Sequence, residues 1–84
     1  MRILFCEWGA PNEAVIAKTL RDLGHFVREL KMKELPQREV EEEVIFLAHA
    51  ANEYHAELYF TVDYFPNLAM AAKRAGILYY SWLF

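Results

Sequence analysis

Residues 3–12 read ILFCEWGAPN, four apolar residues followed by a short segment rich in turn-forming types. A continuous apolar run that ends in such a turn is typical of a buried parallel strand and the loop after it, so the strand ends near Cys6 or Glu7. Beyond this segment the periodicity becomes helical, because Ile16 and Leu20 lie four residues apart ahead of Gly24, a residue that readily ends a helix. The beginning of the sequence therefore predicts a strand, a loop and a helix in succession.

The alternation of strands and helices continues along the chain. The further elements that we expect are a strand of mixed polarity at 25–30, an amphipathic helix between Pro36 and Tyr54, a strand at 58–62, an Ala-rich helix at 68–75 and an apolar strand at 77–84. Mixed polarity suits the edge of a sheet, whereas the nearly all-apolar last strand is typical of a strand covered on both faces. Such alternation requires a mostly parallel sheet with right-handed crossovers and helices on both faces. We therefore predict an α/β, Rossmann-like or flavodoxin-like three-layer half-domain of about four strands in the order 2-1-3-4.

Composition limits the class of protein. With 84 residues, of which 56% are hydrophobic and 15% aromatic, the sequence indicates one globular domain spanning 1–84. The net charge is −3 and the basic residues are scattered, which argues against a nucleic-acid partner. No apolar stretch reaches the roughly 18 residues that a membrane span needs, and no cleavable signal pattern is present. With Cys6 as the single cysteine, a cytoplasmic location is the expectation.

Two loops are placed to bind a ligand, because open α/β sheets bind ligands at the carboxyl ends of their strands. They are residues 7–12 after the first strand and 63–67 after the third. Glu7 and Asp63 are the carboxylates best placed for acid–base chemistry there, because both follow buried strands. The candidate substrate-binding residues in the same loops are Trp8, Gly9, Ala10, Asn12, Tyr64 and Phe65.

Each candidate also has a simpler structural interpretation. Gly9 can serve only to turn the chain, Asp63 can cap a turn or helix, and Glu7 can be a solvated side chain. The aromatic residues can act as lids over the core. The first loop carries neither G-x-G-x-x-G nor a P-loop pattern, so an NAD or ATP site is not expected.

Other chemistry is not indicated. His49 and Glu53 lie one helical turn apart and His55 follows, but a metal site needs three or four converging ligands, so no metal is expected. Cys6 lies within the first strand and is expected to be a buried thiol. Ser81 lacks the glycines of a nucleophile elbow, which excludes serine hydrolysis.

Four short segments of the sequence resemble a known family. They are the opening MRILF, LGHFV at 23–27, DYFPN at 63–67 and GILYYSW at 76–82. Together they resemble the N-terminal segment of CgeB-like glycosyltransferases, which are related to the spore maturation protein, and the resemblance covers nearly the whole chain. The YFP loop followed by a Y-x-S-W strand is the most specific part of this resemblance.

This resemblance implies a GT-B architecture of two Rossmann-like domains that face a cleft. The N-terminal domain would contact a sugar acceptor or other small molecule, and a C-terminal domain outside these residues would hold the nucleotide-sugar donor, without a bound metal. The two loops would line the acceptor side of the cleft, with Asp63 or Glu7 as the acceptor base. The chain would then be the N-terminal portion of a transferase, inactive by itself and with no cofactor of its own.

A second interpretation is a small stand-alone interaction or ligand-binding module. The last strand ends in Trp82, Leu83 and Phe84 without a turn or polar tail, and an uncovered apolar strand tends to pair with another strand. Ile45 and Phe46 lie off the apolar stripe of their helix and either flank the core or contact a partner. Such a module would form a homodimer through its terminal strand. A receiver-like signalling domain is less favoured, because no acidic pair follows the first strand.

Overall fold

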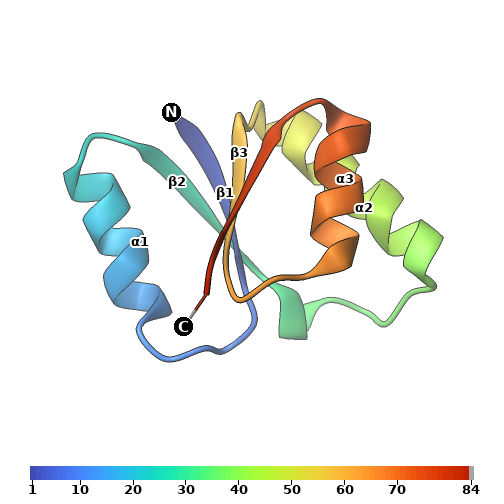
Figure 1. The fold of residues 1–84 in the computed structure, drawn as a ribbon, viewed down its shortest axis with the longest axis horizontal. Coiled ribbons are helices and arrows are strands. Elements are labelled where there is room, and N and C mark those ends of the chain that lie inside the picture. The colour runs from blue at the N-terminus through green and yellow to red at the C-terminus, as the bar shows by residue number, and fades with distance from the viewer. Residues whose placement is uncertain (84) are drawn as a thin grey trace.

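The computed structural model describes residues 1–83, so Phe84 at the end of the expected last strand lies outside the described residues. Strands and helices alternate as the sequence predicts (Figure 1). The elements are β1 (Arg2–Glu7), α1 (Glu13–Asp22), β2 (Phe26–Lys31), a 3-10 turn η1 (Met32–Glu34), α2 (Val40–Tyr54), β3 (Leu58–Val62), α3 (Pro66–Ala75) and β4 (Leu78–Trp82).

The four strands form one parallel sheet in the order β2-β1-β3-β4, which confirms the predicted order. β2 lies at an edge, as its mixed polarity predicts, and β4 lies at the other edge. The register pairs Glu7 at the end of β1 with Lys31 at the end of β2. The two residues therefore leave the sheet side by side at its carboxyl edge.

Helices cover both faces of the sheet, with α1 on one face and α2 and α3 on the other (Figure 1). The alternation of side chains along β1 divides the core between these faces. Ile3 and Phe5 pack in the smaller cluster on the α1 side, whereas Leu4 and Cys6 pack in the larger cluster beneath α2 and α3. The three-layer arrangement is confirmed, and Cys6 is buried as expected.

The helix α3 begins two residues earlier than predicted. The prediction placed its start at Leu68, but the helix begins at Pro66. Proline suits the first helical turn because its missing N–H would have no partner there and its φ is already helical. Gly76 ends the helix with a φ of 72°, a left-handed conformation that glycine adopts with little cost.

The prediction that the last strand is covered on both faces is wrong. Along β4 alternate side chains are exposed, and Leu78, Tyr80 and Trp82 are each at least half accessible. These three side chains lie on the α1 side of the sheet, where α1 packs over β2 and does not reach β4. The apolar composition of β4 therefore produces an open hydrophobic face rather than a buried strand.

Candidate functional site

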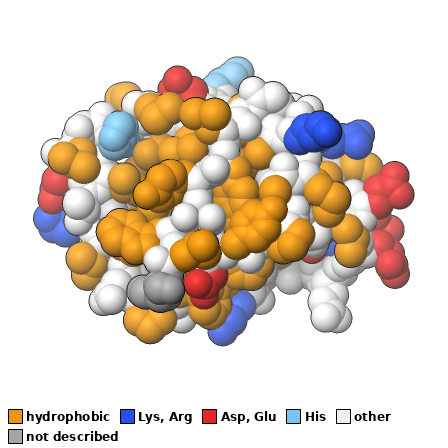
Figure 2. Space-filling model, viewed as in Figure 1, with side chains coloured by type: hydrophobic (Ala, Val, Ile, Leu, Met, Phe, Trp, Pro, Cys, Tyr) orange, Lys and Arg blue, Asp and Glu red, His pale blue; other side chains and the backbone are white. Residues whose placement is uncertain are grey.

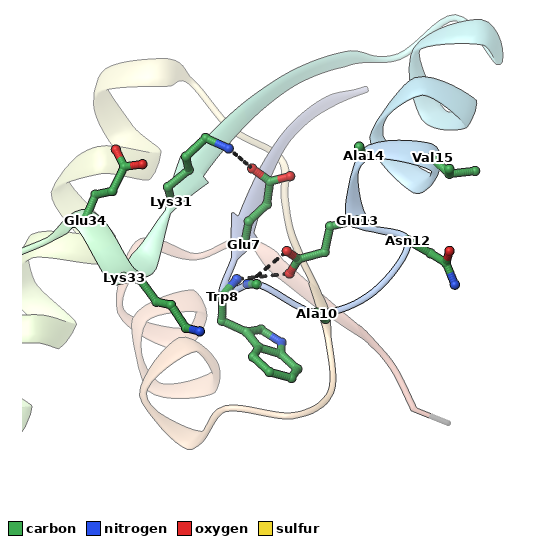
Figure 3. A pocket seen from close by; sticks show the side chains of 11 residues that line it. Glu7, Trp8, Ala10, Asn12, Glu13, Ala14, Val15, Lys31, Lys33 and Glu34 are labelled. Atoms are coloured by element: carbon green, nitrogen blue, oxygen red, sulfur yellow. Dashed lines mark hydrogen bonds and ion pairs between the residues drawn. The ribbon is translucent and has the colours of Figure 1, made fainter.

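A pocket of about 540 Å³ lies at the carboxyl ends of β1 and β2 (Figure 3). It is bounded by the β1–α1 loop, the first turn of α1 and the segment that follows β2. The residues that line it are Glu7, Trp8, Gly9, Ala10, Asn12, Glu13, Ala14, Val15, Lys31, Lys33 and Glu34. The position agrees with the general rule for parallel sheets and brings together five of the eight predicted site residues.

Glu7 is a buried carboxyl group in this pocket. It follows Ile3 and Phe5 at two-residue spacing, so its side chain points to the same apolar face of the sheet, beside the start of α1. Only 6% of the residue is exposed, which rules out the solvated alternative. Within residues 1–83, its Oε1 has no hydrogen-bond partner, and Lys31 Nζ lies 3.7 Å away.

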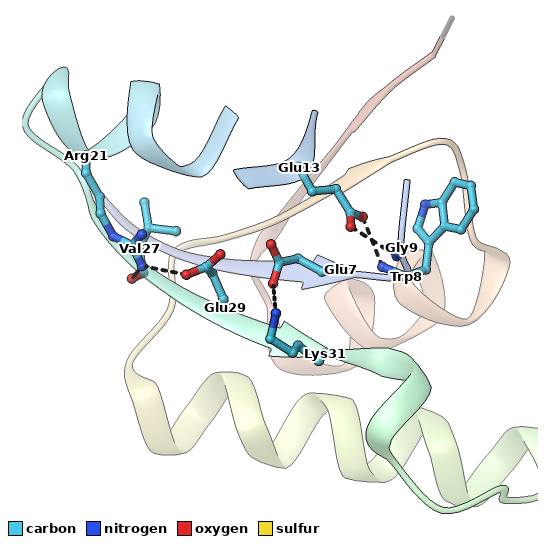
Figure 4. Close-up of polar contacts among 8 residues, drawn as sticks. All are labelled: Glu7, Trp8, Gly9, Glu13, Arg21, Val27, Glu29 and Lys31. Atoms are coloured by element: carbon cyan, nitrogen blue, oxygen red, sulfur yellow. Dashed lines mark hydrogen bonds and ion pairs between the residues drawn. The ribbon is translucent and has the colours of Figure 1, made fainter. Parts of the chain in front are cut away.

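Burial raises the pKa of Glu7 from its ordinary 4.5 to about 7. A hydrogen bond with the carboxyl group of Glu29 and the negative charge of Glu29 act in the same direction, while the Lys31 ammonium opposes them. The pKa of Glu29 is lowered, first by the hydrogen bond with Glu7 and then by Arg21, whose Nη2 donates to Glu29 Oε2 at 3.2 Å (Figure 4). The pKa values of the two neighbouring carboxyl groups therefore shift in opposite directions, with that of Glu7 raised and that of Glu29 lowered.

Glu13 fixes the β1–α1 loop. The backbone N–H of Trp8 donates to Glu13 Oε2 and that of Gly9 donates to Glu13 Oε1, each at 3.0 Å (Figure 4). Glu13 is the first residue of α1 and is itself buried, with 7% exposed. Gly9 has a φ of 100°, and a Cβ at this position would lie 3.1 Å from Lys33 Nζ. The positive φ therefore favours glycine at this position, whereas the flexible end of Lys33 can move away from a Cβ.

The crevice between the ends of β1 and β3 is closed by Trp8. Its indole Nε1 donates a hydrogen bond to the Val62 carbonyl at the end of β3, and its ring meets Phe65 edge-on at 6.0 Å between centroids. This crevice is where the strand order reverses and where open α/β sheets usually bind ligands. With Trp8 in place, the accessible space lies instead on the β2 side of β1.

The β3–α3 loop does not contribute to the pocket. Asp63 has a φ of 70°, a conformation that aspartate tolerates in turns, and its carbonyl accepts a hydrogen bond from Thr61 Oγ1 at 2.7 Å. Tyr64 stacks on Tyr79 at 5.7 Å, and Phe65 contacts Trp8. The structure therefore separates Asp63, Tyr64 and Phe65 from Glu7, apart from the contact that Trp8 makes across the crevice.

Sequence reasoning missed five charged residues of the site, which are Glu13, Glu29, Lys31, Lys33 and Glu34. Glu29 and Lys31 carry a detectable signal, because they alternate with apolar residues and so share the face of β2 that bears the buried Val27. Glu13 stands at the start of α1, where a negative charge is favoured for the helix alone. Its position four residues after a loop glycine is the signal that it can fold back onto the loop.

No group of three or more His, Cys, Asp or Glu side chains suited to a metal ion occurs in the part of the chain that the structure describes. His49 Nε2 lies 3.3 Å from Glu53 Oε1 on the exposed surface of α2, as an isolated pair. None of the helices within residues 1–83 combines the length and apolar character that crossing a bilayer requires.

The chain matches no family model, no curated protein and no solved structure. The fold and the pocket therefore define its class by themselves: an α/β half-domain with a parallel four-stranded sheet and a polar pocket at the carboxyl edge. Because one fold supports many activities, the function must be argued from the chemistry of the pocket.

Proposed function

We propose that this chain is the acceptor-side portion of a glycosyltransferase and that its pocket binds a hydroxylated acceptor. The observation that carries the proposal is Glu7, a buried carboxyl group that faces the pocket with an unpartnered oxygen and a pKa of about 7. A general base works best when its pKa lies near the working pH, and perturbed carboxyl groups in clefts mark functional sites. The sequence segments that resemble CgeB-like transferases suggest the class of reaction, which is sugar transfer.

In the proposed reaction, an acceptor hydroxyl group donates a hydrogen bond to the Glu7 carboxylate. Its oxygen then attacks the anomeric carbon of a nucleotide sugar held by a second domain outside these residues. The new C–O bond forms as the bond to the nucleoside diphosphate breaks, the diphosphate leaves with the electron pair, and the hydroxyl proton passes to Glu7. Lys31, paired with Glu7 in the register, stabilises the carboxylate before transfer.

The proposal is tested by NMR titration of the 84-residue chain with methyl glycosides of glucose, galactose, mannose and N-acetylglucosamine. At least one of them is expected to shift the amide signals of Gly9, Asn12 and Lys31. Binding should tighten between pH 6 and 8 as Glu7 ionises, and this pH dependence should disappear in Glu7→Gln.

Glu34→Gln is the matched control, because it removes a carboxylate from the pocket rim and should leave the pH dependence intact. If none of the four glycosides shifts the pocket amides, the acceptor site is refuted. Sugar transfer by this chain alone would overturn the assignment of the donor to another domain.

A second candidate function is self-association through β4. Leu78, Tyr80 and Trp82 are exposed on this edge strand. Tyr80 and Trp82 also line an apolar groove of about 470 Å³ between the sheet and α1. Figure 2 shows hydrophobic side chains gathered across the middle of this view of the molecule. An edge strand with an apolar face is suited to pairing with a second copy.

The off-stripe residues of α2 do not belong to that surface. Ile45 is exposed, and the ring of Phe46 is covered by the Arg38 guanidinium at 4.1 Å, on the opposite side of the sheet from the groove.

Sedimentation equilibrium tests the association directly. A dimer that Trp82→Lys converts to a monomer supports the module, and a monomer at every concentration refutes it. Lys substitution at Ile45 is the control that should leave the mass unchanged.

A further inference from the structure

We infer that Glu13 is a specificity residue that fills the anion position of the β1–α1 loop, so that the pocket accepts uncharged hydroxylated ligands and rejects phosphate groups. This inference rests on the proposed function of the pocket as an acceptor site and names the chemical class of the acceptor. It is carried by the contacts of Glu13 with the loop and by the unpartnered oxygen of Glu7.

The β1–α1 loop carries two backbone N–H groups that point to one carboxylate. In many α/β proteins the backbone N–H groups of the loop before a helix form a site for phosphate, together with those at the helix start. Here the N–H groups of Trp8 and Gly9 point to the two oxygens of the Glu13 carboxylate, each at 3.0 Å. The chain therefore supplies its own anion, which satisfies both donors before any ligand arrives.

Glu13 is also difficult to displace. The residue is 7% exposed and belongs to the first turn of α1, so its carboxylate cannot swing into solvent without leaving both N–H groups unpaired. A phosphate in the pocket would approach Glu13 and the Glu7 carboxyl group together, and both repel it at neutral or higher pH. Lys31 offers little compensation because it already faces Glu7.

Glu7 has an oxygen that is free to accept a hydrogen bond from a ligand. Its buried Oε1 lacks a hydrogen-bond partner within residues 1–83. An ionised carboxylate can only accept hydrogen bonds, so it needs a ligand that donates. A neutral hydroxyl group can donate without adding charge, whereas a phosphate dianion brings two negative charges toward the carboxylate. Lys33 also lines the pocket and can donate to hydroxyl oxygens of such a ligand.

The experiment titrates wild type, Glu13→Ala, Glu13→Gln and Glu34→Ala with inorganic phosphate and with methyl β-glucopyranoside, following backbone amides by NMR. In wild type, phosphate should leave the Trp8 and Gly9 amides unchanged. In Glu13→Ala both N–H groups are freed, and phosphate affinity should rise at least about tenfold with shifts at these two amides. Glu34→Ala removes a charge from the same pocket without freeing an N–H group, and it should gain nothing.

Phosphate shifts at Trp8 or Gly9 in wild type overturn the inference, and so does a folded Glu13 variant that gains no phosphate binding. Glu13→Gln keeps the shape of the side chain and removes its charge, so it serves if Glu13→Ala does not fold. The glucoside titration reports on the proposed function separately. Phosphate gain by Glu13→Ala without glucoside binding in wild type would refute the acceptor site while leaving Glu13 as the group that excludes phosphate.

Discussion

Replacing Glu7 by glutamine should stabilise the fold at pH 8 and have little effect at pH 5. Glutamine has nearly the same shape and cannot ionise, and its amide can donate a hydrogen bond as a protonated carboxyl group can. At pH 5 wild type holds a neutral carboxyl group in the pocket, so the two proteins are alike. At pH 8 wild type must keep a buried charge that glutamine lacks.

The magnitude follows from the pKa of Glu7. The folded state binds its proton up to about pH 7, whereas the unfolded chain releases it near 4.5, so the stability of wild type falls as the pH rises through this window. The full difference between these values corresponds to about 3 kcal/mol. We expect Glu7→Gln to exceed wild type by about 1 to 3 kcal/mol at pH 8 and by less than about 1 kcal/mol at pH 5, where the unfolded chain has released only part of its proton.

Glu29 acts in a different range of pH. Its pKa is lowered in the folded state, so its contribution to stability is present above the unfolded pKa and is lost only as the pH falls through the folded value. Between pH 5 and 8 the change in stability therefore reports on Glu7. This separation allows one variant to test the environment of one carboxyl group.

Urea denaturation at pH 5, 6, 7 and 8, followed by circular dichroism, measures the free energy of unfolding of each protein. Glu42→Gln is the control, because it makes the same chemical change at an exposed position of α2. A constant difference between Glu7→Gln and wild type across this range would refute the argument that burial destabilises the Glu7 carboxylate. A Glu7→Gln variant that is less stable than wild type at pH 8 would refute the argument as well.

Three further substitutions test the loops around the pocket by thermal unfolding. Gly9→Ala should cost about 1 to 3 kcal/mol, and Gly24→Ala a similar amount, because both glycines have a positive φ and the flexible end of Lys33 can move away from a Cβ at Gly9. Trp8→Phe should cost about 1 to 2 kcal/mol, since it leaves a carbonyl at the end of β3 without its indole donor. Tyr79→Phe should cost about 1 to 3 kcal/mol, because its hydroxyl group joins β3 to the loop before α3. Tyr80→Phe on the exposed face of β4 should be neutral, and equal effects for the two tyrosines would contradict this assignment.

The fold could be predicted from the sequence because its signals are local and repeated. Apolar runs at 3–6 and 58–62 specify buried strands, and the change to helical spacing between them fixes the parallel crossovers. The exposure of β4 could not be predicted in this way. Composition shows that a strand is apolar, but only the placement of α1 over β2 determines which apolar strand stays uncovered.

The candidate site was only partly predictable. The rule for parallel sheets located the loop after β1, yet it could not show that Trp8 closes the crevice toward β3 and separates Asp63 from Glu7. Glu13 and Glu29 were missed because their roles depend on a loop that folds back and on strand register. Contacts of this kind arise between residues whose individual propensities give no sign of them.

The helix α1 contributes less buried surface than the other two helices. Only Glu13 and Ala17 of α1 are buried, compared with four residues of α2 and three of α3. Segments with few buried contacts open most readily in native proteins. Amide hydrogens of α1 should therefore exchange with solvent before those of α2, and each opening withdraws Glu13 from the loop. The occupation of the Trp8 and Gly9 N–H groups by the Glu13 carboxylate is thus tied to the local unfolding equilibrium of a single helix.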